Sequence, residues 1–261
     1  MDYLIIGTVA FLASGLTLYS GFGLGTVLLP AFALFFPAET AVAATGTVHL
    51  LNNLFKGGLL RRTADWRIVM RFGLPAIPAA ILGAWVLAQL GETGVVYDWS
   101  AFGRAFRPSG AGVVIGALMI IFALLELQPW FQRLAAPPRL MPLGGLLTGF
   151  IGGLSGQQGA LRSMFLLKSG LDPQHYIATG VMIAIIIDLS RLPTYAASFS
   201  GAALGGDQGL RLIVVGTLCA FAGAWLGARY SKKATVGVVR AIVASLMLAI
   251  GTALILGFLG A

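Results

Sequence analysis

Residues 153–163 read GLSGQQGALRS and interrupt a region that is otherwise apolar. MPLGGLLTGFIG precedes this stretch at residues 141–152, and MFLLKSG follows it at residues 164–170. The stretch contains three glycines, two glutamines, two serines and one arginine. Polar and charged side chains are expensive inside a membrane and usually serve a function there. The stretch therefore predicts a break in a membrane helix.

The composition is that of a membrane protein. Of the 261 residues, 58% are hydrophobic and 10% are charged, and the mean hydropathy is +0.91. Soluble domains carry roughly 25% charged residues. No porin-like alternation of polar and apolar residues is visible, so we predict an all-α polytopic membrane protein. The net charge of +8 lies in short loops, where it sets orientation, and indicates no nucleic-acid partner.

Apolar segments recur along the whole chain. The first lacks a preceding positive region, so we interpret it as a helix and not as a cleaved signal. The second, sixth and seventh have only about 12 or 13 residues, whereas a spanning helix needs about 20. These short, glycine-interrupted segments predict broken or re-entrant helices. The segments are 3–19, 24–36, 39–60, 68–90, 111–128, 141–153, 159–170, 174–199, 211–229 and 236–259.

An internal repeat is visible in the same segments. Ala44-Thr45-Gly46 recurs as Ala178-Thr179-Gly180, 134 positions later (178 − 44). At this offset Gly25 also matches Gly159. Short glycine-interrupted segments at corresponding places in two halves point to the binding site of a transporter. We predict a first repeat at residues 1–128, a linker at 129–140 and a second repeat at 141–261.

The basic loops exchange their positions between the two halves. In half one the loop after residues 39–60 is basic and the next loop is roughly neutral, whereas half two shows the reverse order. By the positive-inside rule the halves have opposite orientations, each with a broken or re-entrant hairpin and three transmembrane helices. The linker then lies in the cytoplasm and both termini lie outside. The basic residues are Arg61, Arg62, Arg67 and Arg71 in half one, and Arg229, Lys232, Lys233 and Arg240 in half two.

The segments that carry the repeat are similar to a known family. GFGLGTVLLPAFALFFPAETAVAATG at 21–46 and GFIGGLSGQQGALRSMFLLKSGLDPQHYIATG at 149–180 resemble the repeated signature of the sulfite exporter TauE/SafE family. The resemblance implies membrane transport of small anions, often sulfur oxyanions or organosulfonates. Half two departs from the glycine-rich pattern, because Gln157 and Gln158 stand opposite Gly23 and Leu24. The family's substrate is therefore not carried over.

The two predicted breaks, at Gly21–Gly25 and Gly153–Gly159, suit an anion. A broken helix leaves unpaired backbone N–H groups at the start of the next half-helix, where the helix dipole also favours negative charge. Amide and hydroxyl side chains donate to oxyanions, and arginine adds a planar positive fork. The alternatives are that the glycines serve helix packing and that Arg162 reaches a membrane interface. The predicted binding residues at the breaks are Gly23, Gly25, Ser155, Gln157, Gln158, Gly159, Arg162 and Ser163.

The helix predicted at residues 39–60 carries a polar stripe. Its members lie within an arc of roughly 100° at about 100° per residue. Such a stripe faces a cavity or another helix, so we predict that it contributes to the site. The alternatives are hydrogen bonds between helices and, for Lys56, an approach to the inner interface. The stripe consists of Thr45, His49, Asn52, Asn53 and Lys56.

The matching helix of half two carries different groups. Thr179 keeps the stripe, whereas Asp188 and Arg191 add charges three residues apart that can pair on one face. Arg191 is predicted either to pair with Asp188 or to serve the anion site or an outer gate. Lys56, Asp188, Arg191 and His49 are the candidates for coupling or gating, and His49, which titrates near neutrality, can relay a proton.

These observations predict a secondary transporter that moves a small anion, such as an organosulfonate, sulfite or a related sulfur oxyanion, across the cell membrane by alternating access. A passive anion channel is the alternative. With two histidines, one cysteine and no nucleophile or zinc motif, the chain is not expected to be an enzyme or to hold a metal or cofactor. The coupling ion, a proton or Na⁺, and the oligomeric state, including a homodimer, are left open.

Overall fold

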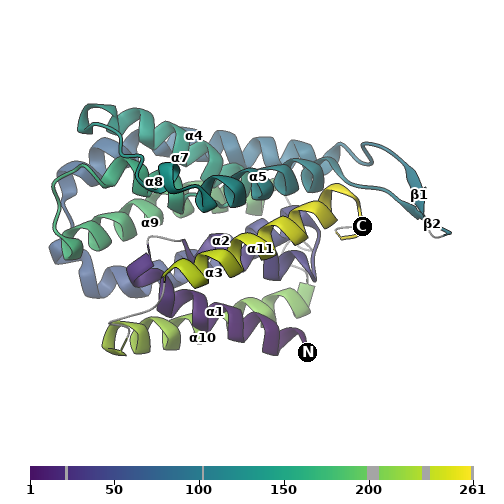
Figure 1. Cartoon of the computed structure of the whole chain (residues 1–261), viewed down its shortest axis with the longest axis horizontal. Helices are drawn as coiled ribbons and strands as arrows, with labels where there is room; N and C mark the ends of the chain where they lie inside the picture. Colours follow the sequence, from purple (N-terminus) through teal and green to yellow (C-terminus); the bar gives the residue numbers. More distant parts are fainter. Residues whose placement is uncertain (21–22, 102, 199–205, 231–235, 260–261) are drawn as a thin grey trace.

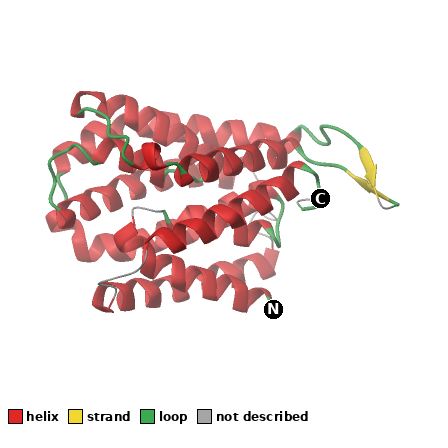
Figure 2. Cartoon of the chain, in the orientation of Figure 1, coloured by secondary structure: helices red, strands yellow, loops and turns green. Residues whose placement is uncertain are grey.

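The chain folds into a bundle of helices with one small β-hairpin at its edge (Figure 2). The computed structural model describes residues 1–20, 23–101, 103–198, 206–230 and 236–259. The predicted all-α architecture is correct for the bundle, but the sequence interpretation missed the hairpin of β1 (Trp99–Ala101) and β2 (Arg104–Phe106). Gly103, with φ 73°, supplies the turn between these two antiparallel strands.

The helices of the first half follow the apolar segments closely. Two of them, α1 and α2, are separated by the glycine-rich stretch that was predicted as a break, of which residues 21 and 22 lie outside the described chain. The helices are α1 (Asp2–Ser20), α2 (Leu24–Ala33), α3 (Ala38–Leu60), α4 (Trp66–Glu92) and α5 (Gly110–Leu127), with the short 3₁₀ turn η1 (Arg61–Thr63) after α3.

The second half repeats this order of elements after the linker. The linker contains the short helix α6 (Pro129–Gln132) and the 3₁₀ turn η2 (Pro138–Leu140). The helices that follow are α7 (Met141–Ser155), α8 (Gly159–Leu166), α9 (Pro173–Ser198), α10 (Gly206–Tyr230) and α11 (Val236–Ile255). In the basic loop between α10 and α11, Lys232 and Lys233 lie outside the described residues.

Four helices in the described part of the chain are long and apolar enough to cross a membrane, namely α4, α5, α9 and α10. The 23 residues of α3 match a membrane span in length, but its polar stripe lowers its hydropathy. The 15 residues of α7 extend about 22 Å, less than the roughly 30 Å of a bilayer core. A helix of this length does not cross the bilayer core by itself.

The helices of one half pack on those of the other. The most extensive contacts join α4 to α7 and α1 to α10, so the fourth helix of each half lies along the first helix of its counterpart. On α7 the glycines fall every fourth residue: a Cβ atom on Gly145 would lie 2.0 Å from the Phe72 carbonyl oxygen, and one on Gly153 2.1 Å from that of Ala80. These glycines bring the two backbones together.

The α1–α10 contact is built in the same way. A Cβ atom on Gly223 would lie 2.1 Å from the Phe11 carbonyl oxygen, and one on Gly227 would lie 2.6 Å from that of Gly15. In each contact, glycines of one helix thus lie against backbone carbonyl groups of the other helix. The alternative interpretation of the break glycines, close helix packing, is correct for Gly153.

Each short helix folds back along the helix before it. α2 packs against α1, and the far end of α8 returns to the start of α7, where Phe165 covers Gly144. The Ala136 backbone N–H of the linker donates to the Met164 carbonyl at 3.0 Å and holds this end in place. The α7–α8 hairpin thus enters and leaves at the same end of the molecule.

Both termini and the β-hairpin lie at one end of the bundle, opposite the linker (Figure 1). Trp99 stacks on Phe106, with ring centroids 4.8 Å apart, and Phe258 packs against both rings. The indole N–H of Trp99 donates to the Leu256 carbonyl at 2.9 Å. A loop of the first half therefore holds the end of α11, the last helix of the second half.

At the opposite end, Asp172 precedes α9 and accepts hydrogen bonds from the backbone N–H groups of Gln174 and His175 at 2.9 and 3.1 Å. These bonds, with the His175 backbone N–H contributing most, hold the pKa of the Asp172 carboxyl below its ordinary value. The carboxylate satisfies helix N–H groups that would otherwise lack partners, and so defines where α9 begins.

Candidate functional site

The two helix breaks meet in the interior of the molecule. A Cβ atom on Gly23, the N-cap of α2, would lie 3.5 Å from Gly159 Cα, the first residue of α8. A Cβ atom on Gly25 would lie 3.1 Å from the Gly156 carbonyl oxygen. The N-terminal ends of two half-helices, each with unpaired backbone N–H groups, therefore lie against one another.

The second break is narrower than predicted. The sequence interpretation placed it at Gly153–Gly159, but α7 continues to Ser155 because Gly153 packs against the α4 backbone inside the helix. Gly156 ends α7 with φ 77°, a left-handed conformation that glycine adopts without strain. Only Gly156, Gln157 and Gln158 separate α7 from α8.

The two glutamines of the break are buried but differ in their partners. Gln157 is 2% exposed, and neither its amide nitrogen nor its amide oxygen has a hydrogen-bond partner in the described part of the chain. Gln158 is 1% exposed and donates from Nε2 to Asp188 Oδ1 at 3.0 Å. An unpaired buried amide is costly, so Gln157 is the group at this break that is free to bind a ligand.

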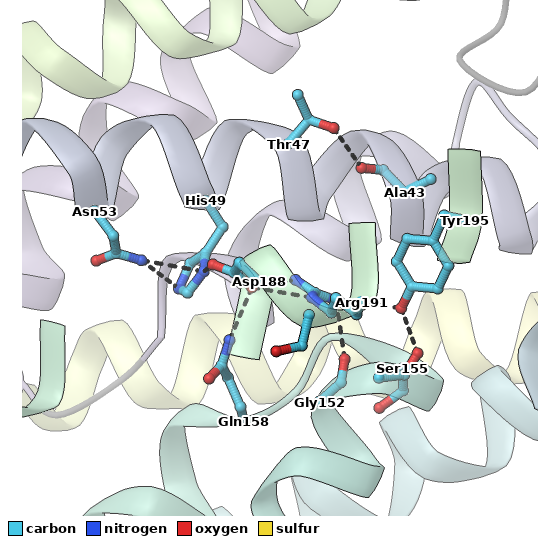
Figure 3. Close-up of polar contacts among 12 residues, drawn as sticks. Ala43, Thr47, His49, Asn53, Gly152, Ser155, Gln158, Asp188, Arg191 and Tyr195 are labelled. Carbon is cyan, nitrogen blue, oxygen red and sulfur yellow. Dashed lines mark hydrogen bonds and ion pairs between the residues drawn. The ribbon is translucent and has the colours of Figure 1, made fainter. Parts of the chain in front are cut away.

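A charged cluster lies beside the second break (Figure 3). Asp188 is completely buried, and its Oδ2 lies 2.6 Å from His49 Nδ1. Its other oxygen, Oδ1, accepts from Gln158 Nε2 and from Arg191 Nε, the latter at 2.9 Å. Arg191 Nη2 also lies 2.9 Å from Oδ1 but is not aligned for a hydrogen bond. The cluster joins α3, the second break and α9.

Arg191 anchors the end of α7. Its Nη1 donates to the Gly152 carbonyl oxygen at 2.9 Å, and its guanidinium lies 5.8 Å from the centre of the Tyr195 ring. The Tyr195 hydroxyl in turn donates to the Gly153 carbonyl oxygen. Of the two roles predicted for Arg191, the structure has the ion pair with Asp188, so the guanidinium positions the break.

The sequence interpretation missed Tyr195. The signal was present, because Asp188, Arg191 and Tyr195 follow each other at spacings of three and four residues and so share one face of α9. A buried tyrosine needs a partner for its hydroxyl, and the open carbonyls at the end of α7 provide one.

The polar stripe of α3 faces three different neighbours. Thr45 lies next to Gly25 of the first break, and its hydroxyl has no partner among the described residues. Asn52 accepts a hydrogen bond from the Ser14 hydroxyl of α1 at 3.0 Å, as the alternative of bonding between helices predicted. Asn53 places its amide nitrogen 3.2 Å from His49 Nε2. The stripe is thus partly structural and partly directed at the breaks.

Two further cations lie near the breaks. Lys56 is 7% exposed, one turn beyond Asn53 on α3, and does not extend into solvent. Arg162 is half-buried, with Nη1 3.5 Å from Gln158 Oε1 and Nε near Gly180. Neither side chain forms an ion pair with a carboxylate among the residues that the structure describes.

Three other predicted binding residues use their hydroxyls within the protein. The Ser155 hydroxyl donates to the Ile151 carbonyl at 3.1 Å, and the Ser163 hydroxyl donates to the Gly159 carbonyl at 3.0 Å. Thr179 Oγ1 accepts from the Asp65 backbone N–H at 2.9 Å, where α4 begins. Ser163 and Thr179 lie on helices as predicted, whereas Ser155, predicted to lie in the break, is the last residue of α7. Spacing alone does not show which hydrogen bonds each hydroxyl makes.

The comparison with protein families bears on this arrangement. The family model described as "Sulfite exporter TauE/SafE" matches residues 3–254, which includes both breaks, both Ala-Thr-Gly helices and the charged cluster. The chain belongs to the TauE/SafE family. This TauE/SafE protein is therefore a multi-pass membrane transporter of a family of sulfite exporters. Comparisons with curated proteins and with solved structures gave no match.

Proposed function

We propose that this TauE/SafE protein is a secondary transporter for a small anion, an organosulfonate, sulfite or a related sulfur oxyanion, that works by alternating access. The anion binds where the N-terminal ends of α2 and α8 meet. The backbone N–H groups of these ends and the Gln157 amide donate to its oxygens.

One observation supports this proposal above the others: two half-helix N-termini converge beside a buried amide without a partner. Each N-terminus carries a partial positive charge, and the two meet at Gly23 and Gly159. Gly23, Gly25 and Gly159 place no side chain between the two ends, which lie in contact in this structure, so an anion reaches the N–H groups when the ends separate. Discontinuous helices bind anionic substrates in this way in other transporters.

The charges around the breaks support an anion rather than a cation. Asp188 and Arg191 offset each other as an ion pair, which leaves Lys56 and Arg162 without a carboxylate partner among the described residues. A buried positive charge without a counter-ion is costly. We infer that the substrate supplies the missing negative charge from the side of α8.

The exchanged packing supports two inverted repeats. The α4–α7 and α10–α1 contacts follow the pattern expected of a two-fold axis between residues 1–128 and 141–261. Both termini lie at the end opposite the linker. With the basic linker at 129–140 in the cytoplasm, both termini lie outside.

The burial of the breaks supports alternating access over a passive channel. A channel has an aqueous path that exposes its lining on both sides, whereas Gln157 and Gln158 are almost inaccessible. In an alternating-access transporter the site is closed in at least one state, and the hairpins move against the rest of the molecule to open it.

Counterflow in proteoliposomes tests this proposal. Vesicles loaded with unlabelled sulfite or isethionate are diluted into a trace of the same labelled anion, and a carrier accumulates label transiently whereas a channel does not. Absence of any anion flux in wild-type vesicles contradicts the transport function, and flux without counterflow indicates the channel.

Arg162 provides the matched variants for this assay. A charge-assisted hydrogen bond contributes about 1.5–3 kcal/mol, so Arg162→Gln is expected to weaken anion affinity about 10- to 150-fold. Arg162→Lys keeps the charge but loses the planar fork, and recovers part of the loss. Arg139→Gln, the same change in the exposed linker, leaves affinity unchanged. Normal affinity in Arg162→Gln places the anion elsewhere.

A further inference from the structure

His49 lies between the two breaks and is connected to both. A Cβ atom on Gly25, in the first turn of α2, would lie 3.9 Å from His49 Cδ2. On its other side, His49 Nδ1 contacts Asp188 Oδ2, and Asp188 Oδ1 accepts from Gln158 at the second break (Figure 3). The imidazole therefore lies next to Gly25 at the first break and is connected to the second break through Asp188.

Asp188 is held as a carboxylate. Gln158 of the break and Arg191 of α9 donate to Oδ1, and His49 Nδ1 of α3 lies 2.6 Å from Oδ2. Protonation of Oδ1 would place a hydrogen against both donors. His49 Nε2 does not contact Asp188, so it is the position in this cluster where a further proton can be held.

The imidazole has one further polar neighbour. With Nδ1 directed at Asp188 Oδ2, the Asn53 amide nitrogen lies 3.1 Å from Nδ1 and 3.2 Å from Nε2. A half-turn of the Asn53 amide presents its oxygen to the ring instead, so a second proton is accommodated by rotating one side chain.

Protonation changes the net charge of a site that already repels cations. Asp188 and Arg191 sum to zero with neutral His49, and to one positive charge when His49 is protonated. The N-terminal ends of α2 and α8 add partial positive charge, and α2 carries no ionisable side chain to offset it. The other ionisable groups near the cluster are Lys56 on α3, Arg162 on α8 and Tyr195 on α9, while Glu39 on α3 and His175 and Tyr176 on α9 lie in the first turns of their helices. Cys219, in the middle of α10, lies against Gly7 of α1, and the other ionisable groups of α4, α5 and α10 lie toward the helix ends.

An anion bound between the two ends would offset the additional positive charge of a protonated His49. The converse holds by thermodynamic linkage: the proton strengthens anion binding by the same factor. We propose that His49 binds the coupling proton of this transporter, so that one anion and one proton cross together. The proton is held on Nε2 and leaves to the same side as the anion, and this step rests on the anion site proposed above.

Proton movement in vesicles tests this inference directly. Isethionate is the first probe, because a sulfonate stays ionised across the working pH range and carries no proton itself. The vesicles contain the pH indicator pyranine, and potassium with valinomycin clamps the membrane voltage. An inward isethionate gradient is then expected to acidify the vesicle interior by about one proton per anion. An inside-alkaline pH gradient is expected to drive accumulation of the anion. Sulfite, corrected for its own protonation, replaces isethionate if only sulfite shows counterflow.

The variant His49→Gln is expected to lower the ratio of protons to anions from about one to near zero, although its anion flux also changes. His175→Gln makes the same change at the other histidine, which is half-exposed at the start of α9, and keeps the ratio of the wild type. Because the ratio is normalised to flux, a partial loss of folded protein does not alter it.

Different outcomes separate this inference from the proposed function. Anion counterflow without proton movement in the wild type, or a Na⁺ gradient that drives accumulation in place of a pH gradient, overturns the role of His49 while the anion site stands. An unchanged proton ratio in His49→Gln also overturns it. No counterflow of either anion contradicts the proposed function itself.

Discussion

The two helices that follow the breaks, α3 and α9, occupy equivalent places in the repeat but carry opposite halves of one cluster. α3 provides His49 and Asn53, whereas the equivalent positions of α9 are Ile183 and Ile187, both completely buried in an apolar cluster. α9 provides Asp188, whose equivalent on α3 is Leu54, an exposed residue. Neither half builds the cluster alone. On the duplication that the sequence repeat predicts, two similar backbones carry side chains that diverged to meet across the interface.

The breaks differ in the same way. The first consists of glycine and apolar residues, and the second places Gln157 and Gln158 at the equivalent positions. The first break thus contributes bare backbone, while the second contributes backbone and amides. If both halves bind the anion, their contributions differ in kind, and equivalent substitutions in the two halves have unequal effects.

The largest effect is expected at Asp188, which contacts His49 of the other half and forms the buried ion pair with Arg191 on its own helix. Asp188→Asn keeps the shape but leaves Arg191 buried without a counter-charge, which is expected to cost about 3–5 kcal/mol of stability. The double variant Asp188→Asn/Arg191→Gln removes both charges and should recover part of this loss. Unfolding in detergent measures both. A double variant less stable than Asp188→Asn would contradict the mutual dependence of the two charges.

The unequal breaks are tested by Gln157 and Gln158. Gln157→Leu is expected to weaken anion binding by about 10- to 150-fold, the equivalent of roughly 1.5–3 kcal/mol. Its stability should hold or rise, because a buried unpaired amide is removed. Gln158→Leu breaks the bond to Asp188 and should lower stability as well. Calorimetric binding of sulfite and isethionate, alongside a thermal melt, compares the two. Equal losses of stability would refute the distinction drawn between them.

The packing glycines test whether the two exchanged contacts are equivalent. Gly153→Ala in α7 and Gly223→Ala in α10 each place a methyl group against a backbone carbonyl, and each should cost about 1–3 kcal/mol. Gly58→Ala on α3 is the control, since open space surrounds that position, and it should gain up to about 1 kcal/mol through helix propensity. Thermal melts rank the three. A tolerated Gly223→Ala would show that the two contacts are not alike.

The smallest effects are expected at the two Ala-Thr-Gly motifs. Thr179→Val removes the partner of the Asp65 N–H and should cost about 1 kcal/mol of stability without changing anion affinity. Thr45→Val removes a hydroxyl without a partner among the described residues beside the first break. It should change affinity and leave stability intact. If the two threonines respond alike in both assays, the motif has the same role in each half.

Much of this arrangement could be read from the sequence. Helix positions follow from hydropathy and length, because a bilayer imposes both on each segment separately. The breaks follow from glycine runs, and the polar faces of α3 and α9 follow from helical period. Asn52 bonding between helices and the pairing of Asp188 with Arg191 were each among the alternatives that the sequence allowed.

The tertiary structure decided which of these groups meet. His49 and Asp188 are 139 residues apart, and no local pattern indicates that α3 and α9 bring them within 2.6 Å. Nor does spacing distinguish Gly153, which packs on α4, from Gly156, which ends α7. Hydropathy and period act within one helix, whereas hydrogen-bond partners and backbone contacts depend on how separate helices pack. The sequence therefore determined the helices and their polar faces, and only their packing made a site from them.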